Sequence, residues 1–187
     1  MAVVAAVVSA GVLCGTGAEG QPPVADPVKW SGDIVAAPPP SPPAQLTAVP
    51  YIPPVLPQGV AKETGLQVDT IRAARAVSAR FPEILDIGGV RSDPLKWHPH
   101  GLAIDVMIPN PRSEAGIALG DQVVAYVMEN AERLGVVHAI WRQTIYKPDG
   151  SARLMADRGG DTANHYDHVH VATDGGGYPK DGQVFLR

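Results

Sequence analysis

The sequence predicts an α+β domain with a small, mainly antiparallel sheet and helices packed on one side of it. Apolar residues recur with helical spacing in two segments of the chain, and four shorter apolar runs are typical of strands. Their order is helix, strand, strand, helix, strand, strand, which favours the α+β class. The sequence contains no internal repeat.

The first helix is expected at residues 68–80, where the apolar positions follow the helical period until Pro82 ends the pattern. Residues 84–90 form a short apolar run broken by two glycines, which predicts a strand that leads into a loop. Residues 102–108 are apolar except for Asp105 and predict a buried strand.

The second helix is expected from Asp121 to Leu134, with Gly135 at the position of a C-terminal cap. Residues 136–141 predict a strand, which could continue through Ile145. Residues 168–172 alternate between polar and apolar side chains and predict the last strand.

Composition divides the chain into an apolar segment (1–20), a Pro-rich linker (21–60) and a globular domain (61–187). Residues 21–60 hold 12 of the 19 prolines. Proline lacks an N–H donor and fixes φ, so we expect this linker to be extended and solvated, as a semi-rigid spacer. The remaining residues are enough for one compact core.

The N-terminal segment predicts export. Residues 2–13 are nearly all Ala and Val and precede small residues, as in a secretory signal peptide cleaved before Glu19. No Lys or Arg precedes the run, so a disordered apolar tail remains the alternative. The run is shorter than the ~20 residues of a spanning helix, and we expect no stable membrane span in the mature protein. A lipid anchor on Cys14 fits poorly, because Leu13 is bulky.

Charge and cysteine content exclude several classes of function. The net charge is −4 and no run of Lys or Arg occurs, so nothing predicts a nucleic-acid-binding face. Cys14 is the single cysteine and lies in the segment expected to be removed. The domain therefore offers no disulfide, thiolate metal ligand or thiol nucleophile.

Asp105 draws attention because a carboxylate inside a buried strand is costly unless it is paired or binds a metal. His98 and His100 precede it, and the segment 165–170 reads His-Tyr-Asp-His-Val-His. Alternate residues of a strand share a face, so His168 and His170 should point the same way. Two imidazoles and a carboxylate are typical of a catalytic zinc site with one open position, although other divalent metals accept such ligands and scattered His and Asp can be purely structural.

The pattern His98-x-x-Gly101-x-Ala103-x-Asp105, with a later strand that ends in His170, resembles the zinc peptidases of the D-alanyl-D-alanine carboxypeptidase, murein endopeptidase and hedgehog type. The resemblance covers about residues 65–172. It implies a small α+β fold with a Zn2+ ion on the sheet, bound by His98, Asp105 and His170. It also implies that Arg91, in Gly-Gly-Val-Arg-Ser, contacts the substrate or the developing oxyanion.

The general base is less well defined by the resemblance. Many of these peptidases have a glutamate where this chain has Asp167, whereas the murein endopeptidase branch shows His-x-x-His-x-His, which His165, His168 and His170 reproduce. His168 and Asp167 are therefore both candidate catalytic residues, with His165 as a further one. Arg91 could instead pair with Asp86, Asp93 or another surface acid.

These observations predict an exported, cell-wall-associated peptidase that uses zinc to hydrolyse the stem peptides of peptidoglycan. The peptidoglycan partner is implied by the resemblance alone. A non-catalytic zinc-containing domain that binds cell-wall material, or a structural domain, is the alternative, and the absence of the family glutamate favours it. His100 fits a solvated loop or a position behind the metal ligands, and Trp141 and Tyr166 fit either a pocket or the core.

Overall fold

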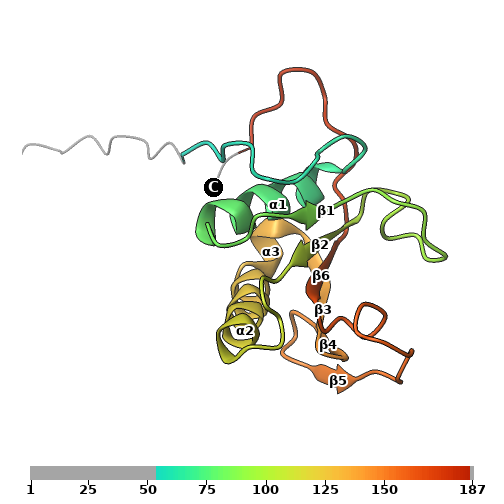
Figure 1. The fold of residues 1–187 in the computed structure, drawn as a ribbon. Coiled ribbons are helices and arrows are strands. Elements are labelled where there is room, and N and C mark those ends of the chain that lie inside the picture. The colour runs from blue at the N-terminus through green and yellow to red at the C-terminus, as the bar shows by residue number, and fades with distance from the viewer. Residues whose placement is uncertain (1–53, 186–187) are drawn as a thin grey trace, which may run out of the picture. The chain divides into compact units, whose positions relative to one another are not determined.

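Six strands form one open antiparallel sheet within residues 54–185, which are the residues that the computed structural model describes (Figure 1). The strands occur in the spatial order β1-β2-β6-β3-β4-β5. Their bounds are β1 Ile87–Gly88, β2 Ala103–Met107, β3 Val136–Trp141, β4 Thr144–Tyr146, β5 Ala152–Leu154 and β6 His168–Thr173. The predicted signal peptide, Cys14 and most of the predicted Pro-rich linker lie outside the described residues.

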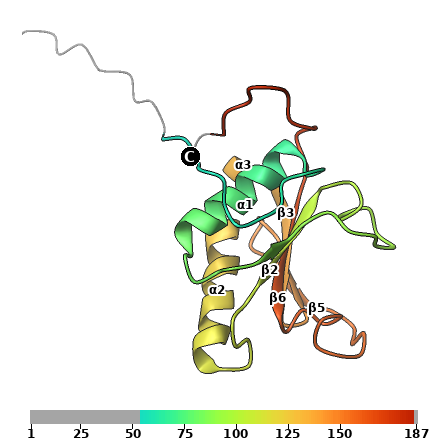
Figure 2. The same ribbon diagram turned by 45° about the horizontal axis from the view of Figure 1, so that its top comes forward.

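The helices α1 (Val68–Arg80), α2 (Glu114–Glu129) and α3 (Ala131–Leu134) lie on one side of the sheet (Figure 2). Strand alternation explains why only this side is covered. Val169 and Val171 of β6 belong to the hydrophobic core beneath the helices, whereas His168 and His170 line a cavity on the opposite face. The predicted α+β class, with an antiparallel sheet and helices on one side, is confirmed.

The first helix has the predicted bounds, but the second differs from its prediction. Helix α2 begins seven residues before Asp121, because the hydroxyl of Ser113 accepts a hydrogen bond of 3.0 Å from the backbone N–H of Gly116 and caps the helix. The chain then bends at Asn130, and α3 is a separate turn of helix. Gly135 ends α3 in the left-handed conformation (φ 64°), as predicted for a C-terminal cap.

Two of the expected strands are shorter than the sequence suggests. Only Ile87 and Gly88 of the apolar run at 84–90 pair with β2. Strand β3 ends at Trp141 and does not continue through Ile145, because Arg142 and Gln143 have positive φ angles of 47° and 62° and turn the chain back into β4. Strand β5 has only three residues and all are exposed, so its sequence gives no strand signal.

The packed body begins before residue 61, where the sequence predicts the end of the linker. Leu56 is buried in the core, its N–H donates to the carbonyl of Phe185 (2.7 Å), and its own carbonyl accepts a hydrogen bond from Arg75 (3.0 Å). The guanidinium of Arg75 also contacts both carboxylate oxygens of Glu63 and lies over the Phe185 ring. These contacts hold both ends of the described chain against α1.

Over residues 54–185, none of the helices combines the length and the apolar character that crossing a bilayer requires.

Candidate metal centre and the cavity around it

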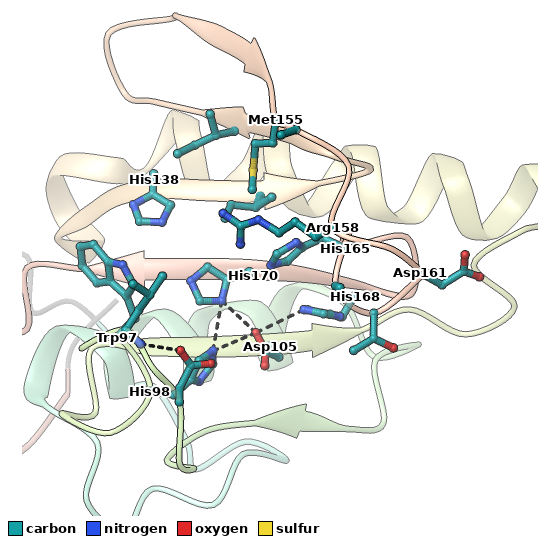
Figure 3. Close-up of a pocket in the computed structure, with 18 of the residues that line it drawn as sticks. Trp97, His98, Asp105, His138, Met155, Arg158, Asp161, His165, His168 and His170 are labelled. Atoms are coloured by element: carbon teal, nitrogen blue, oxygen red, sulfur yellow. Dashed lines mark hydrogen bonds and ion pairs between the residues drawn. The ribbon is translucent and has the colours of Figure 1, made fainter.

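Three residues predicted as metal ligands meet on the face of the sheet opposite the helices (Figure 3). Asp105 on β2 and His170 on β6 are direct cross-strand partners, which brings their side chains together on one face. His98 lies in the turn that precedes β2 and reaches the same point. All three are buried, with at most 8% of each residue exposed.

The ligand atoms are spaced as a tetrahedral metal site requires. His98 Nε2 lies 3.2 Å from Asp105 Oδ1 and 3.2 Å from His170 Nδ1, and His170 Nδ1 lies 2.9 Å from Asp105 Oδ1. Zinc bonds of ~2.0–2.1 Å to nitrogen and oxygen place tetrahedral ligands roughly 3.3 Å apart. The donor set and its spacing therefore fit a divalent metal.

A backbone carbonyl fixes the orientation of the His98 ring from the side that faces away from Asp105 and His170. Its Nδ1 lies 2.9 Å from the carbonyl oxygen of Gly89, so this nitrogen carries the proton and Nε2 presents its lone pair to the other two ligands. The turn that carries His98 approaches the segment just before α1 at Gly101, which has φ 67° and whose missing side chain would collide with the carbonyl of Gly65. Glycine is therefore required between His98 and β2.

Arg91 lies on the far side of Asp105, away from His98 and His170. Its Nη2 is 3.1 Å from Asp105 Oδ2, and its Nη1 is 2.6 Å from Asp93. Burial opposes ionisation of Asp105, but close contacts with His170 and His98 outweigh it and hold the pKa of this carboxyl well below its ordinary value. Arg91 leaves Oδ1 of Asp105 directed at the histidines and is itself engaged by two carboxylates.

His168 is held beside the three ligands by Asp167. Strand β6 begins at His168, so Asp167 lies in the preceding turn, and its Oδ1 is 2.6 Å from His168 Nδ1. The hydroxyl of Thr162 donates to the other oxygen of Asp167 (2.5 Å). This arrangement turns Nε2 of His168 toward Asp105 Oδ1, at 3.5 Å. Asp167 itself reaches His168 and does not line the cavity.

His165 has the least satisfied environment of the group. Its Nδ1 is the one buried side-chain polar atom without a hydrogen-bond partner in residues 54–185, and its backbone is left-handed (φ 57°). The ring lies 4.8 Å from that of His168 and 5.6 Å from that of His170, measured between centroids. Burial, together with the charges of His168 and His170, lowers the pKa of His165 to about 3.

Sequence reasoning missed His138. Its ring stacks on that of His170 with centroids 5.7 Å apart and meets the edge of Trp97 at 4.8 Å. Burial, followed by the charges of His170 and Lys147, lowers its pKa to about 4. The signal was present, because His138 is a lone polar residue inside an apolar strand, as Asp105 is.

The residues around this group line a cavity of about 1150 Å³. One wall is the loop between β5 and β6, from which Arg158 extends across the cavity between His138 and His170 (Figure 3).

His100 is exposed and does not contribute to the lining. Trp141 is buried in the core, where its Nε1 donates to Asp121 (3.0 Å), and Tyr166 donates its hydroxyl to Gln143 (3.2 Å). The aromatic residue that lines the cavity is Trp97.

Comparison with known proteins gives one family. The model described as VldE, C-terminal domain, matches residues 62–166. The matched part contains His98 and Asp105 and ends before His168 and His170. Neither the curated proteins nor the solved structures contain a match to the chain.

Proposed function

The chain belongs to the family of VldE C-terminal domains, and we propose that it is an exported zinc-dependent peptidase acting on the stem peptides of peptidoglycan. The observation that carries the proposal is the convergence of His98 Nε2, Asp105 Oδ1 and His170 Nδ1 in a cavity large enough for a peptide. Three protein ligands and an open side are typical of hydrolytic zinc sites, whereas structural zinc sites are closed by four.

Zinc bound by these three residues would polarise an amide carbonyl and promote ionisation of water. The remaining groups of the site serve proton transfer. His168 accepts a proton at Nε2 from the attacking water and returns it to the leaving amine, while Asp167 holds its Nδ1–H. His165 has an unpartnered nitrogen in the same cavity and is the second candidate for this role.

Export and the peptidoglycan substrate are supported by the apolar N-terminal segment, by the Pro-rich segment after it, and by the resemblance to zinc peptidases of the cell wall. An exported enzyme on a semi-rigid spacer can act at a distance from its point of attachment.

A non-catalytic zinc domain that binds cell-wall peptides is the second candidate. It is favoured by one observation: the residue at the position of the family glutamate is Asp167, and its carboxylate contacts His168 and Thr162 rather than the cavity.

Metal content and turnover of the full-length protein test both candidates. We expect about one zinc per chain by mass spectrometry, loss of this zinc in His170→Ala, and normal zinc in His100→Ala, which changes an exposed histidine. His168→Ala should keep zinc and release no fragments from purified stem peptides, whereas wild type releases them. Zinc binding and peptide binding without cleavage by wild type would support the second candidate, and absence of zinc after supplementation would refute both.

A further inference from the structure

The floor of the cavity is a single row of cross-strand partners. Asp105 pairs with His170, His170 with Ile140, Ile140 with Ile145, and Ile145 with Arg153. Directly opposed residues of antiparallel strands project from the same face, and all five line the cavity. The row therefore runs at right angles to the strands, from the candidate metal ligands on β2 and β6 to the edge strand β5.

The row has a defined length. Neighbouring strands are ~4.8 Å apart, so three steps separate His170 from Arg153 by roughly 14 Å. An extended peptide advances ~3.4 Å per residue, so about four residues span this distance. Ile140 and Ile145 form the apolar middle of the floor, and Met155 lines the cavity beside them.

Charge distinguishes the far end of the row from its beginning. Arg91 near the ligands is engaged by Asp93 and Asp105. The ion pairs formed among residues 54–185 include neither Arg153 nor Arg158. Arg158 extends over the histidines (Figure 3). Arg153 stands at the end of the apolar floor, because it is the cross-strand partner of Ile145 on the edge strand β5. Arg153 is exposed, so its guanidinium is free to meet an incoming carboxylate, and Arg–carboxylate contacts are stronger than hydrogen bonds between neutral groups.

We propose that the cavity is a linear cleft that binds a peptide in extended form across β6, β3, β4 and β5, and that Arg153 contacts an acidic group about four residues from the bond held at the metal ligands. The inference rests on the proposed function, since it takes the metal centre as the point of cleavage. It adds a substrate class: peptides with apolar or small residues next to the cleaved bond and a carboxylate farther along.

A set of peptides with a zinc-binding hydroxamate at the C-terminus can measure the distance from the metal centre to the contact with the acidic group. The peptides are added to the zinc-loaded full-length protein. The hydroxamate fixes one end at the metal, and a single glutamate is placed one to six residues away in a chain of Ser and Ala. Calorimetry should show the lowest Kd with glutamate at about the fourth residue, roughly 5- to 10-fold below the matched glutamine peptide. Arg153→Gln should abolish this minimum and Arg153→Lys should retain it.

Arg158→Gln is the matched control, because it removes the other unengaged arginine of the cavity. We expect it to leave the position of the minimum unchanged. A flat series in wild type would overturn the inference while leaving the peptidase proposal intact. A minimum at the first residue that disappears in Arg158→Gln would also overturn it and would assign the acidic group to Arg158. Failure of every hydroxamate to bind would refute the proposed metal centre and the inference together.

Discussion

At the residue scale, the carboxylate of Asp167 acts through His168. It lies 2.6 Å from Nδ1 of this ring and is itself fixed by Thr162. Replacing a carboxylate that orients an imidazole commonly costs 10- to 100-fold in activity or metal affinity. Because His168 is not among the three converging candidate ligands, we expect loss of the Asp167 carboxylate to lower turnover and to leave metal affinity unchanged.

Asp167→Asn should therefore lower kcat/KM for stem-peptide hydrolysis by about 10- to 100-fold and leave zinc content unchanged. The measurement is a steady-state assay combined with metal analysis of the same sample. Asp149→Asn, in the exposed turn between β4 and β5, is the control and should behave as wild type. Unchanged kcat/KM in Asp167→Asn would show that the carboxylate of Asp167 does not act through His168.

The sequence identifies the site residues unevenly, and the reason is physical. His98, Asp105 and His170 stand out because a charged group in an apolar strand and alternating histidines are local patterns. His138 shows the same local pattern, a polar residue in an apolar strand, but its place beside His170 follows only from the pairing of β3 with β6. Similarly, the pairing of Arg91 with both Asp93 and Asp105 depends on a loop that local patterns do not describe.

At the scale of elements, helix α2 packs against β3 through Gly120. A side chain at this position would collide with the indole of Trp141, which is 1% exposed. Glycine inside a helix normally costs about 1 kcal/mol relative to alanine, so Gly→Ala usually stabilises a helix. Here overpacking opposes this gain, because the buried indole cannot move without shifting its neighbours.

Gly120→Ala should consequently lower the free energy of unfolding by about 1–3 kcal/mol, as measured by urea denaturation. Ala125→Gly, at an exposed position of the same helix, measures the helix propensity of alanine relative to glycine without a packing effect. It should lower the free energy of unfolding by about 1 kcal/mol. Stabilisation by Gly120→Ala would mean that α2 and β3 are less closely packed than the structure shows.

The accuracy of the element predictions follows from how much each element depends on distant residues. Helix α1 has an apolar face and a proline after its end, and its bounds match the prediction. The first turns of α2 were missed because Gly116 and Gly120 interrupt the apolar pattern, although both are buried against neighbouring chain. Strand β5 is held by backbone pairing with β4, and its three exposed residues are too few to form a recognisable strand pattern.

At the scale of the whole molecule, a bound metal would join parts of the chain that are far apart in sequence. A ligand that binds only the folded state stabilises it by RT ln(1 + [L]/Kd), which is about 3 kcal/mol at 100 times Kd. We therefore expect the melting temperature to fall when a chelator removes zinc and to recover when zinc is restored. His170→Ala should melt at the same temperature with and without zinc. If the melting temperature of wild type were also the same with and without zinc, the three candidate ligands would not bind zinc.

Strand β6 has a further consequence for how the protein is made. It is the last strand of the sheet in chain order, yet it lies between β2 and β3 at the centre and supplies His168 and His170. A nascent chain that stops before residue 168 would expose the edges of β2 and β3 and would lack both His168 and His170. Such edges are prone to pairing with other chains. The sheet can therefore be completed only after β6 has been translated. Products that terminate before β6 would remain unfolded and inactive.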